Sequence, residues 1–326
     1  MGLKKMARKG RRVFIKSVTG ILDRPLPAPS ERERNGVEEM RNRIRACPSL
    51  EKADAPPSEK EWLETHERLC ECILHEDPRE FLRWDVVSKT MSVAFAGYIQ
   101  QELDYLKTRP DWKTRWSPSI VESAVGHPIP YWKYPRSSGN LIHHACHVAQ
   151  FEEKTGSAVH DIKFVFEFGG GYGSLCRLFH NLGFQGPYLI FDLPGFSALQ
   201  QFYLKSSGVP VHPVQRFPEE TGGAFCVSDL DLLREMLLHY PDVGSSLFIA
   251  TWSISETPLD LRQRVLPLLA GFNFFLMAYQ DRFGEVRNSE EFRKWQADRQ
   301  DIAWMEWSIH HLPGNRYLMG TENPHV

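Results

Sequence analysis

The feature that most constrains this chain is a cluster of glycines between a strand-like and a helix-like segment. Residues 164–168 are apolar and β-prone apart from Glu167, and an amphipathic segment begins at Ser174. The glycines between them are Gly169, Gly170, Gly171 and Gly173. Such glycines let the backbone turn tightly and let a ligand approach closely, while a helix N-terminus offers free N–H groups. The segment predicts a ligand-binding loop after a buried strand.

Residues 151–326 alternate short β-prone runs with longer amphipathic runs. This alternation is typical of βα units and a largely parallel sheet. The predicted strands are 163–168, 188–192, 209–214, 246–252 and 272–279. The predicted helices are 174–182, 197–206, 229–239, 258–269 and 289–299.

Two further β-prone runs, 302–309 and 317–319, flank a turn signal at residues 313–315 and predict an antiparallel hairpin. A doubly wound sheet that ends in such a hairpin is the seven-stranded Rossmann-like arrangement of class I methyltransferases. Many nicotinamide-binding domains end in a parallel strand instead. We therefore expect an α/β, Rossmann-like seven-stranded sheet with a C-terminal antiparallel hairpin, preceded by a helical N-terminal region.

The spacing of the glycines separates two classes of nucleotide ligand. A dinucleotide fingerprint has Gly-x-Gly-x-x-Gly/Ala, and counting from Gly169 places Ser174 at its last position. The methyltransferase pattern is an acid followed by glycines at alternate positions, and Glu167, Gly169, Gly171 and Gly173 satisfy it. The second predicted strand ends in Asp192, whose carboxylate suits two vicinal ribose hydroxyls. Dinucleotide-binding proteins and methyltransferases both have an acid at this position. The alternative is that Asp192 only forms the turn that follows the strand.

The remainder of the chain divides into two segments before the predicted sheet. Residues 1–60 are basic and rich in proline, and they predict a partly disordered lead-in. Residues 61–150 carry apolar residues at helical spacing and predict a helical region that caps the substrate. Residues 151–326 form the predicted Rossmann-like methyltransferase domain.

Several polar residues are predicted to lie near the carboxyl edge of the sheet or on the helix before it. The fourth strand ends in Thr251 and Trp252, and Glu256 follows them. Glu256 is a candidate base, or simply an acid that favours a helix N-terminus. His143 lies on a predicted helix with His147 on the same face; substrate contact, metal ligation and an ordinary satisfied histidine are all open. Further candidate bases are His144, His239, His310 and His311.

Charge and hydropathy exclude several classes of partner. A formal net charge of −2 gives no global basic field, so we expect no nucleic-acid partner. No apolar run approaches the roughly 18 to 20 residues of a membrane-spanning helix. The basic residues within 1–16 predict a solvated terminus, or a weak peripheral contact with a phosphate-rich surface. The cysteines lack metal-ligand spacing, and without a secretory signal we expect reduced thiols, a cytoplasmic location and no metal.

Beyond the glycine motif, the sequence resembles a family of sugar O-methyltransferases found in bacterial surface-polysaccharide gene clusters. The resemblance covers roughly residues 80 to 320 and rests on the segments 166–175, 191–195, 198–204 and 253–256. It implies S-adenosylmethionine as cofactor, with Glu167 and the glycines around its methionine part and Asp192 on its ribose. It does not imply which residue is the base. The acceptor is chosen by the helical region and loops.

The resulting hypothesis is S-adenosylmethionine-dependent O-methylation of a sugar or glycan hydroxyl, for polysaccharide biosynthesis. Its cofactor-binding residues are Glu167, Gly169, Gly170, Gly171, Gly173, Asp192, Thr251 and Trp252, and its catalytic candidates are Glu256 and His143. Trp116, Tyr131, Trp132 and Tyr134 are either a platform for a sugar ring or core packing. The alternatives are an NAD(P)-dependent sugar oxidoreductase and a non-catalytic partner protein with a methyltransferase fold. The acceptor sugar and the oligomeric state stay open.

Overall fold

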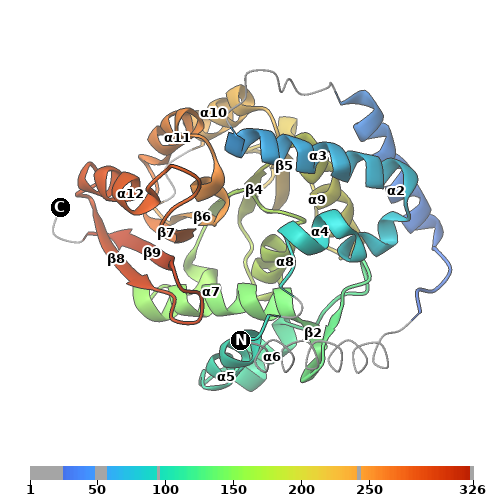
Figure 1. Ribbon diagram of the computed structural model, residues 1–326, viewed down its shortest axis with the longest axis horizontal. Helices are drawn as coiled ribbons and strands as arrows, with labels where there is room; N and C mark the ends of the chain where they lie inside the picture. Colours follow the sequence, from blue (N-terminus) through green and yellow to red (C-terminus); the bar gives the residue numbers. More distant parts are fainter. Residues whose placement is uncertain (1–24, 48–56, 94–95, 241–243, 324–326) are drawn as a thin grey trace, which may run out of the picture.

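The computed structural model describes residues 25–47, 57–93, 96–240 and 244–323. Its centre is a seven-stranded sheet in the order β5-β4-β3-β6-β7-β9-β8 (Figure 1). The strands are β3 (Phe164–Phe168), β4 (Pro187–Phe191), β5 (Gly223–Val227), β6 (Ser246–Thr251), β7 (Phe274–Gln280), β8 (Ile302–Ser308) and β9 (Asn315–Glu322). Strands β3 to β7 are parallel, whereas β9 runs antiparallel to β7 and to β8. The predicted fold class, including the terminal hairpin, is confirmed.

Alternate residues of each central strand face opposite sides of the sheet, as the two-residue period of a strand requires. On β6, Leu247 and Ile249 belong to one hydrophobic core, and Phe248 and Ala250 belong to the other. The first core is covered by α7 (Gly139–Thr155), α8 (Ser174–Asn181) and α9 (Pro194–Ser206). The second is covered by α10 (Leu230–His239), α11 (Leu259–Val265) and α12 (Asn288–Ala297). Helices on both faces make the sheet doubly wound.

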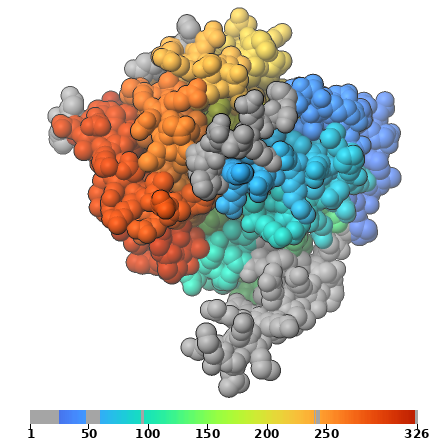
Figure 2. Space-filling view, turned by 45° about the horizontal axis from the view of Figure 1, so that its top comes forward, coloured from blue at the N-terminus to red at the C-terminus, as the bar shows by residue number. Residues whose placement is uncertain are grey.

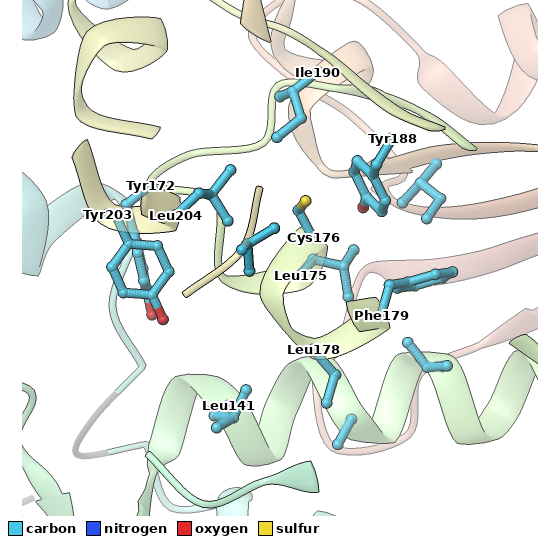
Figure 3. Packing of buried hydrophobic residues seen from close by; sticks show 14 of the residues in the cluster. Leu141, Tyr172, Leu175, Cys176, Leu178, Phe179, Tyr188, Ile190, Tyr203 and Leu204 are labelled. Carbon is cyan, nitrogen blue, oxygen red and sulfur yellow. The ribbon is translucent and has the colours of Figure 1, made fainter. Parts of the chain in front are cut away.

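Helix α8 is the element that joins the glycine loop to the first core. Figure 3 shows Leu175, Leu178 and Phe179 of this helix between Tyr188 of β4 and helix α7. All of these side chains are buried. Because α8 begins directly after the glycines, this packing fixes where the loop points.

The predicted strand 209–214 is wrong, and the true strand is β5 at residues 223–227. Pro210 and Pro213 have no N–H to donate to a ladder, so this run does not form a continuous strand beside β5, which is an edge strand of the sheet. Val211 makes only an isolated bridge to Ala224, and a short 3₁₀ turn, η4 (Val214–Arg216), follows.

Within the expected partly disordered lead-in, residues 31–46 form helix α2 (Glu31–Ala46). Ser30 and Glu33 build a capping box at its start, and the helix packs against α9. The prolines that suggested a linker all lie outside it. The basic segment 1–16 lies outside the described residues.

The expected helical region follows α2 and covers one side of the molecule. Its helices are α3 (Pro57–His75), η1 (Pro78–Arg83), α4 (Asp85–Thr90), α5 (Ile99–Lys107), η2 (Trp112–Trp116) and α6 (Ser117–Ser119). A two-stranded ribbon of β1 (Pro130–Tyr131) and β2 (Tyr134–Ser138) then leads into α7. In Figure 2 the blue and cyan surface of the N-terminal segments and the orange and red surface of the C-terminal segments occupy opposite sides. Among the described residues, no helix has the length and hydropathy needed to cross a membrane.

Candidate active site

A cavity of about 520 Å³ opens at the carboxyl edge of β3, β4 and β6. Ligands of open α/β sheets bind at this edge, where the strand order reverses. Of the predicted residues, the cavity is lined by Glu167, Gly169, Gly170, Gly171, Asp192, Thr251, Trp252, Glu256 and His143. Further lining residues come from α3, the loop after α4 and the loop between β8 and β9. The structure thus brings both catalytic candidates and all cofactor candidates except Gly173 to one cavity.

The glycine loop has a backbone shape that other residues adopt only under strain. Gly169, Gly171 and Gly173 all have positive φ. The Gly169 N–H donates to the Phe191 carbonyl at 2.8 Å, which ties the loop to the end of β4. Gly173 lies outside the cavity lining and instead begins α8 beside Leu204. Its positive φ serves the turn into the helix.

Glu167 is a buried carboxyl group at the end of β3 and is 3% exposed. The Tyr188 hydroxyl donates to its Oε2 at 2.9 Å. Burial raises the pKa of Glu167 to about 8, and the hydrogen bond from Tyr188 only partly offsets this. A buried acid of this kind is a site for a cationic group that would keep it ionised.

Asp192 follows β4 and is held by backbone and side-chain donors. Its Oδ1 accepts from the Leu193 N–H at 2.8 Å, and its Oδ2 accepts from the Gly171 N–H at 3.1 Å and from Gln200 Nε2 at 2.9 Å. Burial raises the pKa of Asp192 to about 7, against these hydrogen bonds, which lower it. The residue is only partly buried, and three N–H donors favour the carboxylate, so we assign the ionised form. A carboxylate has about four acceptor sites, so one stays available for a ligand hydroxyl.

His143 of α7 lines the same cavity. Its Nδ1 is 2.7 Å from Oε1 of Glu102, and its ring stacks on Trp252 at 5.6 Å between centroids. Trp252 has a φ of 65°, which is rare for a residue other than glycine, and its Nε1 donates to Asn315 Oδ1 at 2.6 Å. Backbone strain of this kind is found at functional sites. Trp252 thereby holds the imidazole ring from one side.

Glu256, the other predicted catalytic residue, ends the short helix η5 (Ser253–Glu256). Gln280 Nε2 donates to its Oε1 at 3.2 Å. Burial raises the pKa of Glu256, the bond from Gln280 lowers it, and Glu61 raises it further. Glu256 lines the cavity, but its hydrogen-bond partner Gln280 is neutral. His143, by contrast, is oriented by the carboxylate of Glu102.

The proposed aromatic platform is wrong. None of Trp116, Tyr131, Trp132 and Tyr134 is among the residues that line the cavity. Trp116 is fully buried and Tyr131 is 5% exposed, so both belong to the core. The interpretation of these aromatics as packing is the correct one.

Other candidate residues divide between the cavity and positions outside it. His144 and His147 line the cavity, whereas His310 and His311 lie outside the lining. His310 is exposed and His311 is partly buried. The side chain of His239 lies outside the described residues. Within the described ranges no group of three or more His, Cys, Asp or Glu side chains is arranged to hold a metal ion.

Three lining or supporting residues were missed by the sequence. Asn140 Nδ2 donates to the Met91 carbonyl at 2.6 Å and its Oδ1 accepts from the Val93 N–H at 2.7 Å, so it fixes the loop over the glycines. Asn315 holds Trp252, and Glu102 holds His143. No local sequence pattern indicates a role for these residues, although Asn315 lies within the predicted turn at residues 313–315.

No family model matches the chain, and no curated protein matches it. Similar solved structures include the precorrin-6y C5,15-methyltransferase from Geobacter metallireducens (11% identity over 55% of this chain and 86% of that chain, TM-score 0.36). They also include the ribosomal protein L11 methylase from Lactobacillus delbrueckii subsp. bulgaricus (12%, 57% and 81%, TM-score 0.37). A third is the N-terminal domain of human METTL16 in complex with SAH (11%, 56% and 70%, TM-score 0.36). From its strand order and antiparallel terminal hairpin, this chain has the Rossmann-like fold of class I methyltransferases.

Proposed function

We propose that the protein is an S-adenosylmethionine-dependent O-methyltransferase that acts on a sugar or glycan hydroxyl. The observation that carries the proposal is one cavity lined both by a nucleoside-type set of residues and by an oriented histidine. Its volume of about 520 Å³ lies within the usual range for small-molecule sites, about 300 to 1,000 Å³.

The residues present fit the cofactor. Glu167 offers a buried carboxyl group to the ammonium of the methionine part, and Asp192 offers the one free acceptor site of its carboxylate to a ribose hydroxyl. At Gly170 a Cβ would come within 2.6 Å of the Ile190 side chain and 3.1 Å of Glu167 Oε2, so only glycine leaves the acid accessible. When bound, this cofactor supplies a methyl group on a sulfonium.

The chain's own part in the reaction is to align the acceptor and to take its proton. His143 binds Glu102 through Nδ1, which leaves Nε2 to accept the hydroxyl proton. Trp252 restricts the imidazole ring by stacking. Alignment of the two reactants in a closed cavity supplies much of the remaining rate enhancement.

A sugar acceptor is supported by the segments that resemble sugar O-methyltransferases and by the wall around His143. The partly exposed indole of Trp252 is an apolar face of the kind on which sugar rings pack. Tyr98 and Asn315 add polar groups to the same wall. We retain the cytoplasmic location as part of this proposal.

The first test is calorimetric titration with S-adenosylhomocysteine. We expect Asp192→Ala to bind about 10- to 100-fold more weakly than wild type, because a hydrogen bond to a charged group contributes about 1.5–3 kcal/mol. Asp104→Ala is the matched control: Asp104 is exposed on α5, and its removal leaves affinity unchanged. Binding of NAD and not of S-adenosylhomocysteine would replace the proposal with the oxidoreductase alternative.

Methyl transfer is then measured with radiolabelled S-adenosylmethionine and a panel of glycosides. Transfer to at least one glycoside, lost in His143→Gln, is the expected result. Cofactor binding with no transfer to any glycoside, together with transfer to a non-sugar hydroxyl, would contradict the sugar part alone. Binding with no transfer to any acceptor class would favour the non-catalytic alternative.

Cofactor binding is also expected to release a proton. Because its pKa is about 8, Glu167 is largely protonated in the free protein at pH 7, whereas a bound ammonium favours the carboxylate. Affinity for S-adenosylhomocysteine should therefore rise as the pH increases from 6 towards 8. Calorimetry at pH 7 in two buffers of different ionisation enthalpy measures the released protons directly.

Glu167→Gln is the control for this titration, since its amide cannot lose a proton. The variant should bind more weakly and lose most of the proton release. The raised pKa also means that the folded protein binds a proton more tightly than the unfolded chain does, so this group stabilises the fold at low pH and its contribution is lost as the pH rises through about 8. Equal proton release by wild type and Glu167→Gln would show that another group titrates.

A further inference from the structure

Glu102 is a buried carboxylate that contacts two histidines from distant parts of the chain. It is 1% exposed on α5. Its Oε1 lies 2.7 Å from Nδ1 of His143 and 2.9 Å from Nε2 of His311. Its Oε2 is buried and has no hydrogen-bond partner among the described residues. A burial this complete requires a compensating partner for the charge.

The two imidazoles provide that partner. Burial by itself would raise the pKa of Glu102, yet His143 and His311 together bring it below the ordinary value. Glu102 is therefore a carboxylate, and a carboxylate only accepts hydrogen bonds. Both facing ring nitrogens must then carry the proton.

This arrangement decides which nitrogen of His143 is free. With its proton on Nδ1, the neutral ring has its lone pair on Nε2. Nε2 of His143 has no hydrogen-bond partner among the described residues, and the residue lines the cavity. The groups that face the ring are Glu102, Tyr98, His144, His147 and Trp252.

We propose that Glu102 is the positioning residue for His143, with His311 as the second donor that orients the carboxylate. This inference rests on the proposed function and specifies how its base works. The acceptor hydroxyl proton would pass to Nε2 of His143 as the oxygen forms its bond to the methyl carbon and the bond from that carbon to the sulfonium sulfur breaks, which leaves sulfur as a neutral thioether. Glu102 keeps its negative charge and stabilises the imidazolium; it does not take the proton.

A purely structural tie between α5, α7 and the β8–β9 loop would use the same contacts. The two roles differ in what the ring nitrogens do. Glu102→Gln keeps the shape of the side chain and a hydrogen bond to either tautomer, because an amide both donates and accepts. A structural tie would survive this change, whereas the bias towards Nδ1–H would not.

The experiment is long-range ¹H–¹⁵N correlation spectroscopy of protein labelled with ¹⁵N-histidine. The signals of His143 are assigned as those that are missing from the spectrum of His143→Gln. We expect the Nδ1–H tautomer in wild type and a mixed population in Glu102→Gln. Asp104→Asn, on the same helix and exposed, is the matched control and should give the wild-type spectrum. Unchanged tautomers in a folded Glu102→Gln would overturn the proposal.

Two further measurements separate this proposal from the proposed function. Titration with S-adenosylhomocysteine should be unchanged in Glu102→Gln, since Glu102 does not line the cavity. With an acceptor from the glycoside panel, kcat should fall about 100-fold or more, with KM unchanged. A wild type that binds no S-adenosylhomocysteine overturns the proposed function whatever the spectra show, and equal kcat in both proteins overturns the role of Glu102.

If Glu102→Gln does not fold, His311→Gln is the second variant. It keeps His143 and Glu102 in place and removes only the second imidazole. A partial shift of the His143 tautomer supports the proposal, and a wild-type spectrum with wild-type kcat contradicts the role of His311.

Discussion

Gly169→Ala should abolish cofactor binding and destabilise the fold by about 2–5 kcal/mol. Gly169 has a φ of 73°, a conformation in which alanine is strained by roughly 1–2 kcal/mol. The new Cβ would also lie 2.3 Å from Cβ of Ser253, whose hydroxyl is hydrogen-bonded to the Phe168 carbonyl. The loop and the segment after β6 cannot both stay in place. Both line the cavity, so the change reaches the ligand directly.

Gly183→Ala separates these two effects. Gly183 has a φ of 95°, but no atom lies within 4 Å of the added Cβ. The free energy of unfolding of this variant should therefore fall only by the strain energy, about 1–2 kcal/mol. The variant should bind S-adenosylhomocysteine as wild type does. Urea denaturation and calorimetry of both variants give the comparison. If Gly169→Ala binds the ligand normally, the glycine loop is not the cofactor site.

Glu122→Ala should destabilise the protein by about 3–5 kcal/mol, because it leaves a buried charge without a partner. Arg177 of α8 donates to Oε1 of Glu122 at 3.0 Å, and the two side chains are 8% and 11% exposed. Ser138 donates to the other oxygen at 2.5 Å and caps α7 through the Leu141 N–H. One carboxylate thus fixes the start of the helix that carries His143 and the helix that follows the glycine loop.

The comparison for this variant is Glu39→Ala. Glu39 pairs with Lys205 at 2.8 Å, but its side chain is 45% exposed, and exposed pairs contribute at most about 1 kcal/mol. The midpoints of urea unfolding measure both. If Glu122→Ala loses no more unfolding free energy than Glu39→Ala does, water must solvate Arg177 when Glu122 is removed.

The sequence was informative wherever the signal was local. β3, β4, β6 and β7 were predicted to within two residues, because each is a largely apolar, β-prone run. The error at β5 has a local cause as well. The prolines within 209–214 interrupt the backbone donors of that run, and the true edge strand is short and begins at the second of two glycines.

The residues of the candidate site also differ in whether they lie close together in the sequence. Glu167, the glycines and Asp192 lie within one βαβ unit, so their relation is set by a few neighbouring turns. The wall around His143 is assembled from α5, α7 and two loops of the C-terminal half. Glu102 resembles its exposed neighbour Asp104 in sequence, and nothing local shows that a histidine 209 positions away will cover it.

The antiparallel terminal hairpin has a consequence for synthesis. Translation produces β7 before β8 and β9, and until β9 pairs with it the apolar strand Phe274–Gln280 is a free edge. A nascent chain at that stage also has Glu102 without its second imidazole. Unpaired apolar edges are where incomplete chains aggregate. Truncation before residue 302 should therefore yield insoluble protein rather than a smaller folded domain. The emergence of the hairpin completes the cavity and covers the apolar edge of β7 in one step.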